Sequence, residues 1–412
     1  MTPPGPTAAT PDPGPPGPRP LPLHVALQTM TWLSSLAALG GLKSGLLPWR
    51  RDLASAAEAL GKNLDDADAH AFAAAVDAEA RRRLNGFAEG VRRYRRHPRP
   101  ARRNEPPALW RRGSTRLLDY GGRGRALLVV PSLINRGYIL DLTERRSLMR
   151  HLAAAGWRPL LVDWGEPGPA ERRFSLTDYV CGRLEPALDE IVAATGETPA
   201  VIGYCMGGNL ALALAVRRPA LVAALVLLAT PWDFHAGAPG TRRLMQAAAP
   251  GLIALIDQLG ELPVDVIQAM FSSLDPYLTA DKFRRFAALP ADSEKAREFV
   301  ALEDWLNDGV PLVGSVAREC LLGWYVENTP PGGRWRIDGR PVVAAEARMP
   351  TLVAIPANDH IVPPGSAAAL AGAIPGAKAA RLAAGHIGMV AGRRARTMLY
   401  DPLTRWLAKT LT

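Results

Sequence analysis

Short apolar runs alternate with longer amphipathic stretches from about residue 115 to the C-terminus. The apolar runs that predict strands are 126–130, 159–162, 200–204, 223–228, 351–355 and 379–382, with 117–120 as a candidate outer strand. Helical periodicity falls between most of them, at 141–155, 176–194 and 206–217. Apolar strands separated by helices are typical of a sheet that is covered on both faces. The pattern therefore predicts an α/β fold with a mostly parallel central sheet and helices on both faces.

Three segments complete the expected organisation. Residues 1–22 contain ten prolines, which predicts a disordered or polyproline-like tail. Residues 23–104 contain Ala-rich runs with apolar residues at helical spacing, so we expect a helical N-terminal region with an Arg-rich linker. Residues 105–412 then form the α/β domain, with a helical cap insertion at about 233–345. Helices within the insertion are predicted at 240–248, 292–307 and 312–325.

The stretch 21–42 carries no charge apart from a His24 that could be protonated, and it could just span a bilayer. Gln28, Thr29 and Ser34 make it only weakly apolar, so a packed or interfacial helix is the favoured interpretation. No secretory leader is expected, because a basic start followed by an apolar core is missing. Three cysteines indicate neither a disulfide framework nor a zinc site, which fits a reduced, cytoplasmic setting.

The net charge of +10 is concentrated in one segment of the chain. Residues 81–116 hold thirteen Arg against Glu89 and Glu105, a local charge of +11, so the remainder is about neutral. A solvated linker or face is the favoured interpretation of this segment. An anionic partner, a granule or membrane surface, and nucleic acid are the alternatives.

The segment 203–208 reads Gly-Tyr-Cys-Met-Gly-Gly, and it follows a predicted strand and precedes a predicted helix. Glycines two residues before and after Cys205 permit a strained turn without Cβ clashes. This is the nucleophile elbow of α/β-hydrolases, with Cys in place of the usual Ser. We therefore expect the α/β-hydrolase fold, with Cys205 as the nucleophile.

The acid and the base of such a triad follow the nucleophile in chain order. Asp359 comes just after the strand 351–355, and His386 lies in the loop after 379–382. His386 would accept the proton of the Cys205 thiol, since a free thiol is mostly protonated at neutral pH. Asp359 would fix the imidazole tautomer and stabilise the imidazolium.

An oxyanion hole is expected from two backbone N–H groups. One belongs to Met206, directly after the nucleophile, and the other to Leu133 or Ile134 in the loop 131–135 after the first core strand. Each of these residues could also have a purely structural role. A cysteine after a strand, for example, usually packs as a small apolar side chain. The correct chain order of all three side chains favours a triad. Cys181 and Cys320 lie in helix-like runs and are interpreted as structural thiols.

Several segments together resemble polyhydroxyalkanoate (poly-3-hydroxybutyrate) synthases. The elbow 203–208 is similar to their Gly-x-Cys-x-Gly-Gly box, 359–363 (Asp-His-Ile-Val-Pro) to their acid loop, and 385–387 (Gly-His-Ile) to their base loop. The runs 131–135 (Pro-Ser-Leu-Ile-Asn), 138–142 (Tyr-Ile-Leu-Asp-Leu) and 314–342 extend the resemblance, which covers roughly residues 105–410. Asp141 and His360, which lie in these motifs, are candidate pocket residues; His360 could equally be an ordinary loop residue.

The resemblance implies an acyltransferase that polymerises 3-hydroxyacyl-CoA into polyhydroxyalkanoate and releases CoA, through a thioester on Cys205. The alternative is a Cys-dependent hydrolase of a thioester or of the polyester, which would result if water reached the same intermediate. A non-catalytic granule-associated protein is a third interpretation. The implied partners are 3-hydroxyacyl-CoA, the growing polyester, a granule surface, and a second copy or partner subunit. We expect no nucleic acid, metal or cofactor, and a cytoplasmic, granule-associated location.

Overall fold

The computed structural model describes residues 17–44, 46–49, 51–65, 67–99, 105–237 and 239–411. These residues form two compact units, each built from two separate stretches of the chain. The larger unit comprises Ala101–Ile267 and Asp308–Thr412, and the smaller one combines Gln268–Asn307 with the N-terminal region up to Pro100. Most of the predicted tail, 1–22, lies outside the described residues.

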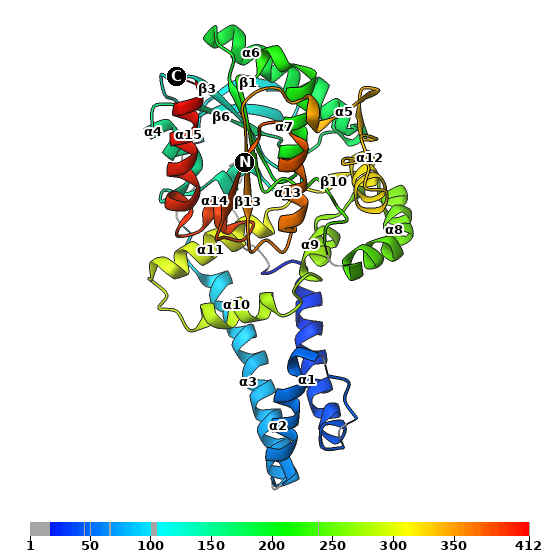
Figure 1. Ribbon diagram of the computed structural model, residues 1–412. Helices are drawn as coiled ribbons and strands as arrows, with labels where there is room; N and C mark the ends of the chain where they lie inside the picture. Colours follow the sequence, from blue (N-terminus) through cyan, green and yellow to red (C-terminus); the bar gives the residue numbers. More distant parts are fainter. Residues whose placement is uncertain are drawn as a thin grey trace, which may run out of the picture. The chain divides into compact units, whose positions relative to one another are not determined.

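An eight-stranded sheet in the order β1-β2-β6-β3-β7-β8-β13-β14 forms the larger unit (Figure 1). Its strands are β1 (Ala108–Arg112), β2 (Thr115–Asp119), β3 (Ala126–Val130), β6 (Arg158–Asp163), β7 (Ala200–Tyr204), β8 (Ala224–Leu228), β13 (Thr351–Pro356) and β14 (Lys378–Leu382). The strands from β6 to β14 in this order are parallel, whereas β1 and β2 pair antiparallel at one edge. β3, β7, β8 and β13 are buried along their whole length, which confirms the predicted fold class.

Helices cover this sheet on both faces (Figure 1). The helices of the larger unit are α4 (Leu148–Ala154), α5 (Leu176–Tyr179), α6 (Glu185–Thr195), α7 (Met206–Arg217), α8 (Pro239–Leu259), α12 (Gly314–Arg318), α13 (Pro364–Ala373), α14 (Gly388–Ala391) and α15 (Asp401–Leu411). Of these, α4, α6, α7 and α13 pack directly on strands of the sheet, whereas α8 and α12 pack on η6 and on each other. Three π-helical segments, η4 (Val180–Leu184), η6 (Glu319–Val326) and η8 (Arg396–Tyr400), continue or precede these helices. Short 3₁₀ turns are η2 (Gly137–Leu140), η3 (Glu171–Arg173), η5 (Pro219–Leu221) and η7 (Ala344–Glu346). Short strand pairs outside the main sheet are β4 (Asp141–Thr143) with β5 (Arg146–Ser147), β9 (Glu261–Leu262) with β10 (Leu312–Val313), and β11 (Arg336–Ile337) with β12 (Arg340–Pro341).

The predicted helix 141–155 is wrong in its first half. The structure has the hairpin β4–β5 there, and α4 begins only at Leu148. Ser147 supplies the reason, because its hydroxyl accepts the backbone N–H of Arg150 and caps the helix at that point. The Asp141 carboxylate meanwhile binds the Arg150 guanidinium through both oxygens, at 2.8 and 3.0 Å, which holds the hairpin against α4.

Five helices form the smaller unit: α1 (Leu21–Lys43), α2 (Ala54–Asp65), α3 (Ala69–Arg96), α10 (Leu278–Ala287) and α11 (Glu294–Asn307), with the turn η1 (Arg51–Leu53) before α2. The helix α9 (Val264–Ser272) crosses the boundary between the units. Phe87 and Tyr94 of α3 pack edge-on against Phe283 of α10, with ring centroids 6.0 and 5.7 Å apart. The insertion 233–345 is thus divided, and its stretch 268–307 shares a core with the N-terminal helices.

Candidate active site

Cys205 lies at the junction between β7 and α7 in a strained backbone conformation. Its φ is +55° and its ψ is −131°, a combination that L-residues rarely adopt. Its N–H donates to the Leu228 carbonyl at 2.9 Å, and its own carbonyl accepts the Gly208 N–H at 2.9 Å. Strain of this kind persists only where the surroundings hold it, and it occurs preferentially at functional sites.

Two glycines of the elbow allow backbones to approach one another closely. A Cβ on Gly203 would collide with Cα of Gly208, and a Cβ on Gly207 would collide with the carbonyl oxygens of Val130 and Pro131. The first turn of α7 therefore lies directly against the end of β3. The loop 131–135, which was predicted to carry an oxyanion donor, begins at this contact.

The side chains of Asp359 and His386 meet in the interior. Nδ1 of His386 lies 2.7 Å from Oδ2 of Asp359, and both residues are buried. The other carboxylate oxygen, Oδ1, accepts the backbone N–H groups of Ile361 and Val362, each at 2.8 Å. A carboxylate can only accept, so Nδ1 carries the proton that it receives. Nε2 is then the nitrogen available to Cys205.

The pKa of His386 is changed by burial and by its two partners, Cys205 and Asp359. Burial by itself lowers the pKa of this imidazole. The negative charge of Cys205, hydrogen bonds with Asp359 and Cys205, and the Asp359 charge outweigh burial and raise the pKa to about 10. The structure thus brings Cys205, His386 and Asp359 together, and the two partners favour the protonated form of the imidazole.

The structure distinguishes between the two candidates for the second oxyanion donor. The Ile134 N–H already donates to Oγ of Ser132 at 3.1 Å. Within the part of the chain that the structure describes, the N–H of Leu133 has no such acceptor. Met206 opens α7, where the first N–H groups have no partner inside the helix. We therefore keep Leu133 and Met206 as the predicted donors.

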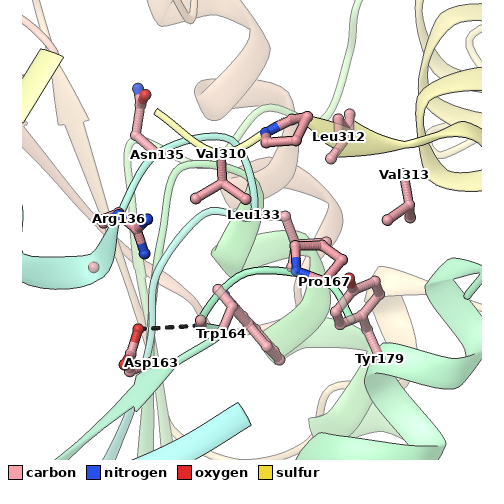
Figure 2. A pocket seen from close by; sticks show the side chains of 13 residues that line it. Leu133, Asn135, Arg136, Asp163, Trp164, Pro167, Tyr179, Val310, Leu312 and Val313 are labelled. Atoms are coloured by element: carbon pink, nitrogen blue, oxygen red, sulfur yellow. Dashed lines mark hydrogen bonds between the residues drawn. The ribbon is translucent and has the colours of Figure 1, made fainter. Parts of the chain in front are cut away.

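Leu133 lines a small pocket (Figure 2). Its volume of about 20 Å³ has room for about one water molecule and not for an acyl chain. Arg136 and Asp163 lie on one side of it, and Tyr179 and Val313 on the other (Figure 2). None of the three triad side chains lines this pocket, so it is not the place where an acyl group would meet Cys205.

The two candidate pocket residues do not join the triad. His360 is exposed, although its neighbour Asp359 is buried. Asp141 is engaged with Arg150, as described above, and it also accepts a hydrogen bond from Tyr120. Both residues are therefore better explained by local structure than by contact with a substrate.

Two tyrosines that the sequence did not single out lie close to the triad. The ring of Tyr204 is 5.2 Å from the His386 ring, and its hydroxyl donates to the His386 carbonyl at 3.3 Å. Burial raises the pKa of Tyr325, and the charge of Cys205 raises it further, so this phenol interacts electrostatically with the sulfur. Tyr204 occupies the x position before Cys205 in the elbow motif, and Tyr325 lies within the family-like segment 314–342. Their places in these motifs were the only signs in the sequence that pointed to the site.

The position of Tyr325 is fixed by contacts with the loop after β8. The Asn328 side chain accepts the Phe234 N–H at 2.9 Å and donates to Asp233 at 2.8 Å. Nε2 of His235 donates to the Tyr325 carbonyl at 3.1 Å, and the Phe234 and Tyr325 rings meet at 4.9 Å. These contacts hold η6, the segment that contains Tyr325, against the loop that follows β8.

Several known proteins are similar to this chain in sequence or in structure. The alpha/beta hydrolase fold family matches residues 125–392. The poly(3-hydroxyalkanoate) polymerase subunit PhaC of Allochromatium vinosum is 30% identical over 285 residues, which cover 68% of this chain and 80% of that protein. The subunit of the same name from Synechocystis sp. is 30% identical over 294 residues, covering 69% and 77%. A solved monoacylglycerol lipase from Paleococcus ferrophilus is 16% identical, with a TM-score of 0.44 over 71% of this chain and 99% of that one. The chain belongs to the poly(3-hydroxyalkanoate) polymerase family, within the α/β-hydrolase fold.

Proposed function

We propose that the chain is an acyltransferase that joins 3-hydroxyacyl groups from CoA thioesters into a polyhydroxyalkanoate and releases CoA. The names of its relatives support the reaction class. The single observation that carries the mechanism is the buried connection from Asp359 through His386 to Cys205, which stands on a strained elbow. A protein that only coats a granule has no physical need for these three side chains together.

The first half of the reaction loads the enzyme. The Cys205 sulfur attacks the thioester carbonyl carbon, and the charge that develops on the carbonyl oxygen is stabilised by the N–H groups of Met206 and Leu133. The bond from the acyl carbon to the CoA sulfur breaks. His386 gives its proton to the departing CoA thiolate, so that CoA leaves as a thiol and the acyl group remains on Cys205.

The second half of the reaction extends the chain. The hydroxyl of a second 3-hydroxyacyl group attacks the Cys205 thioester, and its proton passes to His386. An oxygen ester forms, the bond to sulfur breaks, and Cys205 returns as a thiolate beside the imidazolium. Asp359 keeps Nδ1 protonated and oriented through both halves.

Sulfur suits this reaction better than oxygen would. Attack of a thiolate on a thioester yields a thioester of similar energy, so the acyl group is held without losing its reactivity. Water must be kept away from this intermediate, or the same triad would act as a hydrolase. Tyr325 and the loop that holds it lie near the sulfur and could cover the intermediate.

The partners follow from this chemistry. The steps use only the CoA thioester, the growing polyester and side chains of this chain, so we expect no metal or cofactor. The relatives above are named as subunits, which supports a partner subunit or a second copy. A cytoplasmic location at the surface of a polymer granule fits a polymer product, and it stays a prediction.

One assay tests the proposal and separates it from hydrolysis. The full chain is supplied with 3-hydroxybutyryl-CoA, and free thiol is followed together with the acyl product. Polymer with stoichiometric thiol is expected, and free 3-hydroxybutyrate would instead identify a hydrolase. Cys205→Ala should abolish thiol release. Cys181→Ala is the matched control, because burial, above all, raises the pKa of that thiol to about 11 and it should not react. Equal loss in both variants would contradict the role of Cys205.

A further inference from the structure

α1 carries apolar side chains all round: Leu27, Leu36 and Leu39 are half-buried, and others are exposed. His24 and Gln28 are buried, whereas Met30 and Leu33 are 66% and 57% exposed and Val25 is also exposed. A surface helix normally buries its apolar stripe and exposes its polar one. We call the outward set Val25, Met30 and Leu33, with the small residues Ala26, Ala37 and Gly40 around them, the apolar face of α1.

Specific contacts on the inner side hold α1 in this orientation. Nε1 of Trp32 donates to Oδ1 of Asp77 in α3 at 2.8 Å, and the Arg81 guanidinium lies 4.8 Å above the Trp32 ring. Nε2 of His24 lies 3.3 Å from the Arg19 carbonyl, and burial, first of all, lowers the pKa of this imidazole and keeps it neutral. Turning α1 to bury its apolar face would break these contacts, so the face stays outward.

The exposed apolar surface continues beyond α1. Leu46 is 80% exposed, and Trp49, Leu53 and Leu60 are exposed as well. Seven of the twelve large hydrophobic side chains that are exposed in the described part of the chain fall between residues 25 and 60. Helices α1, α2 and α3 lie side by side, so these side chains belong to one helical group (Figure 1). Exposed apolar surface concentrated in this way marks an interaction site.

The charges around the apolar face indicate what covers it. No residue between 21 and 42 carries a fixed charge, and Lys43, Arg50 and Arg51 follow directly. The neighbouring α3 carries seven Arg against Asp77, Glu79 and Glu89. Basic residues beside an apolar helix, with a Trp at the margin, match an anionic bilayer interface.

We propose that the apolar face of α1 binds the surface of an anionic lipid bilayer. Among the described residues, α1 alone is long and apolar enough to cross a membrane by length and composition. The contacts of Trp32 with α3 favour a helix that lies in the interface, with its apolar face buried about 5–10 Å among the lipids. This inference does not depend on the proposed catalytic function.

A vesicle experiment tests the proposal on the full chain. Sedimentation is measured with vesicles of phosphatidylcholine alone and with vesicles containing one quarter phosphatidylglycerol. We expect binding to the anionic vesicles that weakens with added salt. Leu33→Glu should weaken this binding about tenfold or more, because it places a charge in the buried part of the interface. Leu244→Glu is the matched control, since Leu244 is also 57% exposed but lies in α8 of the larger unit.

Three results would overturn the proposal. The first is an absence of vesicle binding, and the second is equal binding by the two glutamate variants. The third is a dimer, seen by sedimentation velocity, that Leu33→Glu dissociates while vesicle binding is unaffected, because the face would then be an interface between copies. If the first result is accompanied by binding to polyester particles, the face binds the polymer and not lipid. Circular dichroism spectra without vesicles should be equal for both variants, which shows that each is folded.

Discussion

Nδ1 of His386 lies 2.7 Å from Oδ2 of Asp359 in a site where both side chains are withdrawn from water. The second carboxylate oxygen is held by two backbone N–H groups, so the carboxylate cannot turn away from the imidazole. This fixes which imidazole nitrogen bears the permanent proton and leaves the other to exchange a proton with sulfur. The catalytic predictions depend on this contact.

We expect Asp359→Asn to lower kcat by about 10³-fold or more, with the fold retained. The amide can donate its own N–H to Nδ1, and that stabilises the tautomer in which Nε2 is protonated and cannot accept from Cys205. Release of CoA thiol from 3-hydroxybutyryl-CoA measures the effect. Asp292→Asn, a change at an exposed carboxylate, is the control and should be neutral. A rate within a few-fold of the unmodified chain would show that Asp359 does not orient the base.

Cys205→Ser should keep the fold and lose most of the turnover. A serine hydroxyl is much harder to deprotonate than a thiol, and its acyl product is an oxygen ester that does not pass the chain on readily. Circular dichroism checks the fold, and polymer formation from 3-hydroxybutyryl-CoA checks the activity. Turnover equal to that of the unmodified chain would refute the thioester argument.

Removal of the sulfur should lower the pKa of His386. Its value of about 10 results from Cys205 and Asp359 acting against burial, and Cys205→Ala removes the larger of these two favourable contributions. Titration of the His386 ring, followed by NMR in both chains, measures the shift. In the unmodified chain the acylation rate should fall as the pH rises through about 10, because His386 then loses the proton that CoA takes away. An unchanged pKa in Cys205→Ala would mean that the sulfur and the imidazole do not interact.

Asn328→Ala should destabilise the fold by about 1–3 kcal/mol and reduce activity as well. Two hydrogen bonds to the loop after β8 are lost, and a residue that tolerates the positive φ of 53° is replaced by one that does not. Urea unfolding measures the first effect and thiol release the second. Asn85→Ala, at an exposed position of α3, serves as the control. Full activity in a destabilised Asn328→Ala would separate this loop from catalysis.

Much of the fold could be predicted because the central strands are short, apolar and bounded by turn residues. β3 and β7 begin and end where the apolar runs do, since both are buried from end to end. The edge strand β1 escaped prediction because its sequence, Ala-Leu-Trp-Arg-Arg, is largely exposed and lacks an apolar run. Chain order and strand ends were enough to place Cys205, Asp359 and His386 near one another.

Other features depend on contacts between distant residues, and local patterns do not record these. The N–H of Ile134 donates to the hydroxyl of Ser132, a local bond that the motif likewise does not indicate. Tyr325 comes near Cys205 only because Asn328 and His235 fix the surrounding loops. In the same way, the sequence predicted the helix at 292–307 but missed α10, and it did not show that α3 would pack with both.

The core shared by α3, α10 and α11 has a consequence for how the chain is made. Arg93 and Leu289, which are hydrogen-bonded across this core, are 196 positions apart. A ribosome that adds about 5–20 residues per second needs roughly 10–40 seconds to cover that distance. During this interval Phe87, Val91 and Tyr94 have emerged without the partners that bury them. α3 is therefore made early but completes its packing only after α11, and a newly made N-terminal region needs protection from aggregation until then.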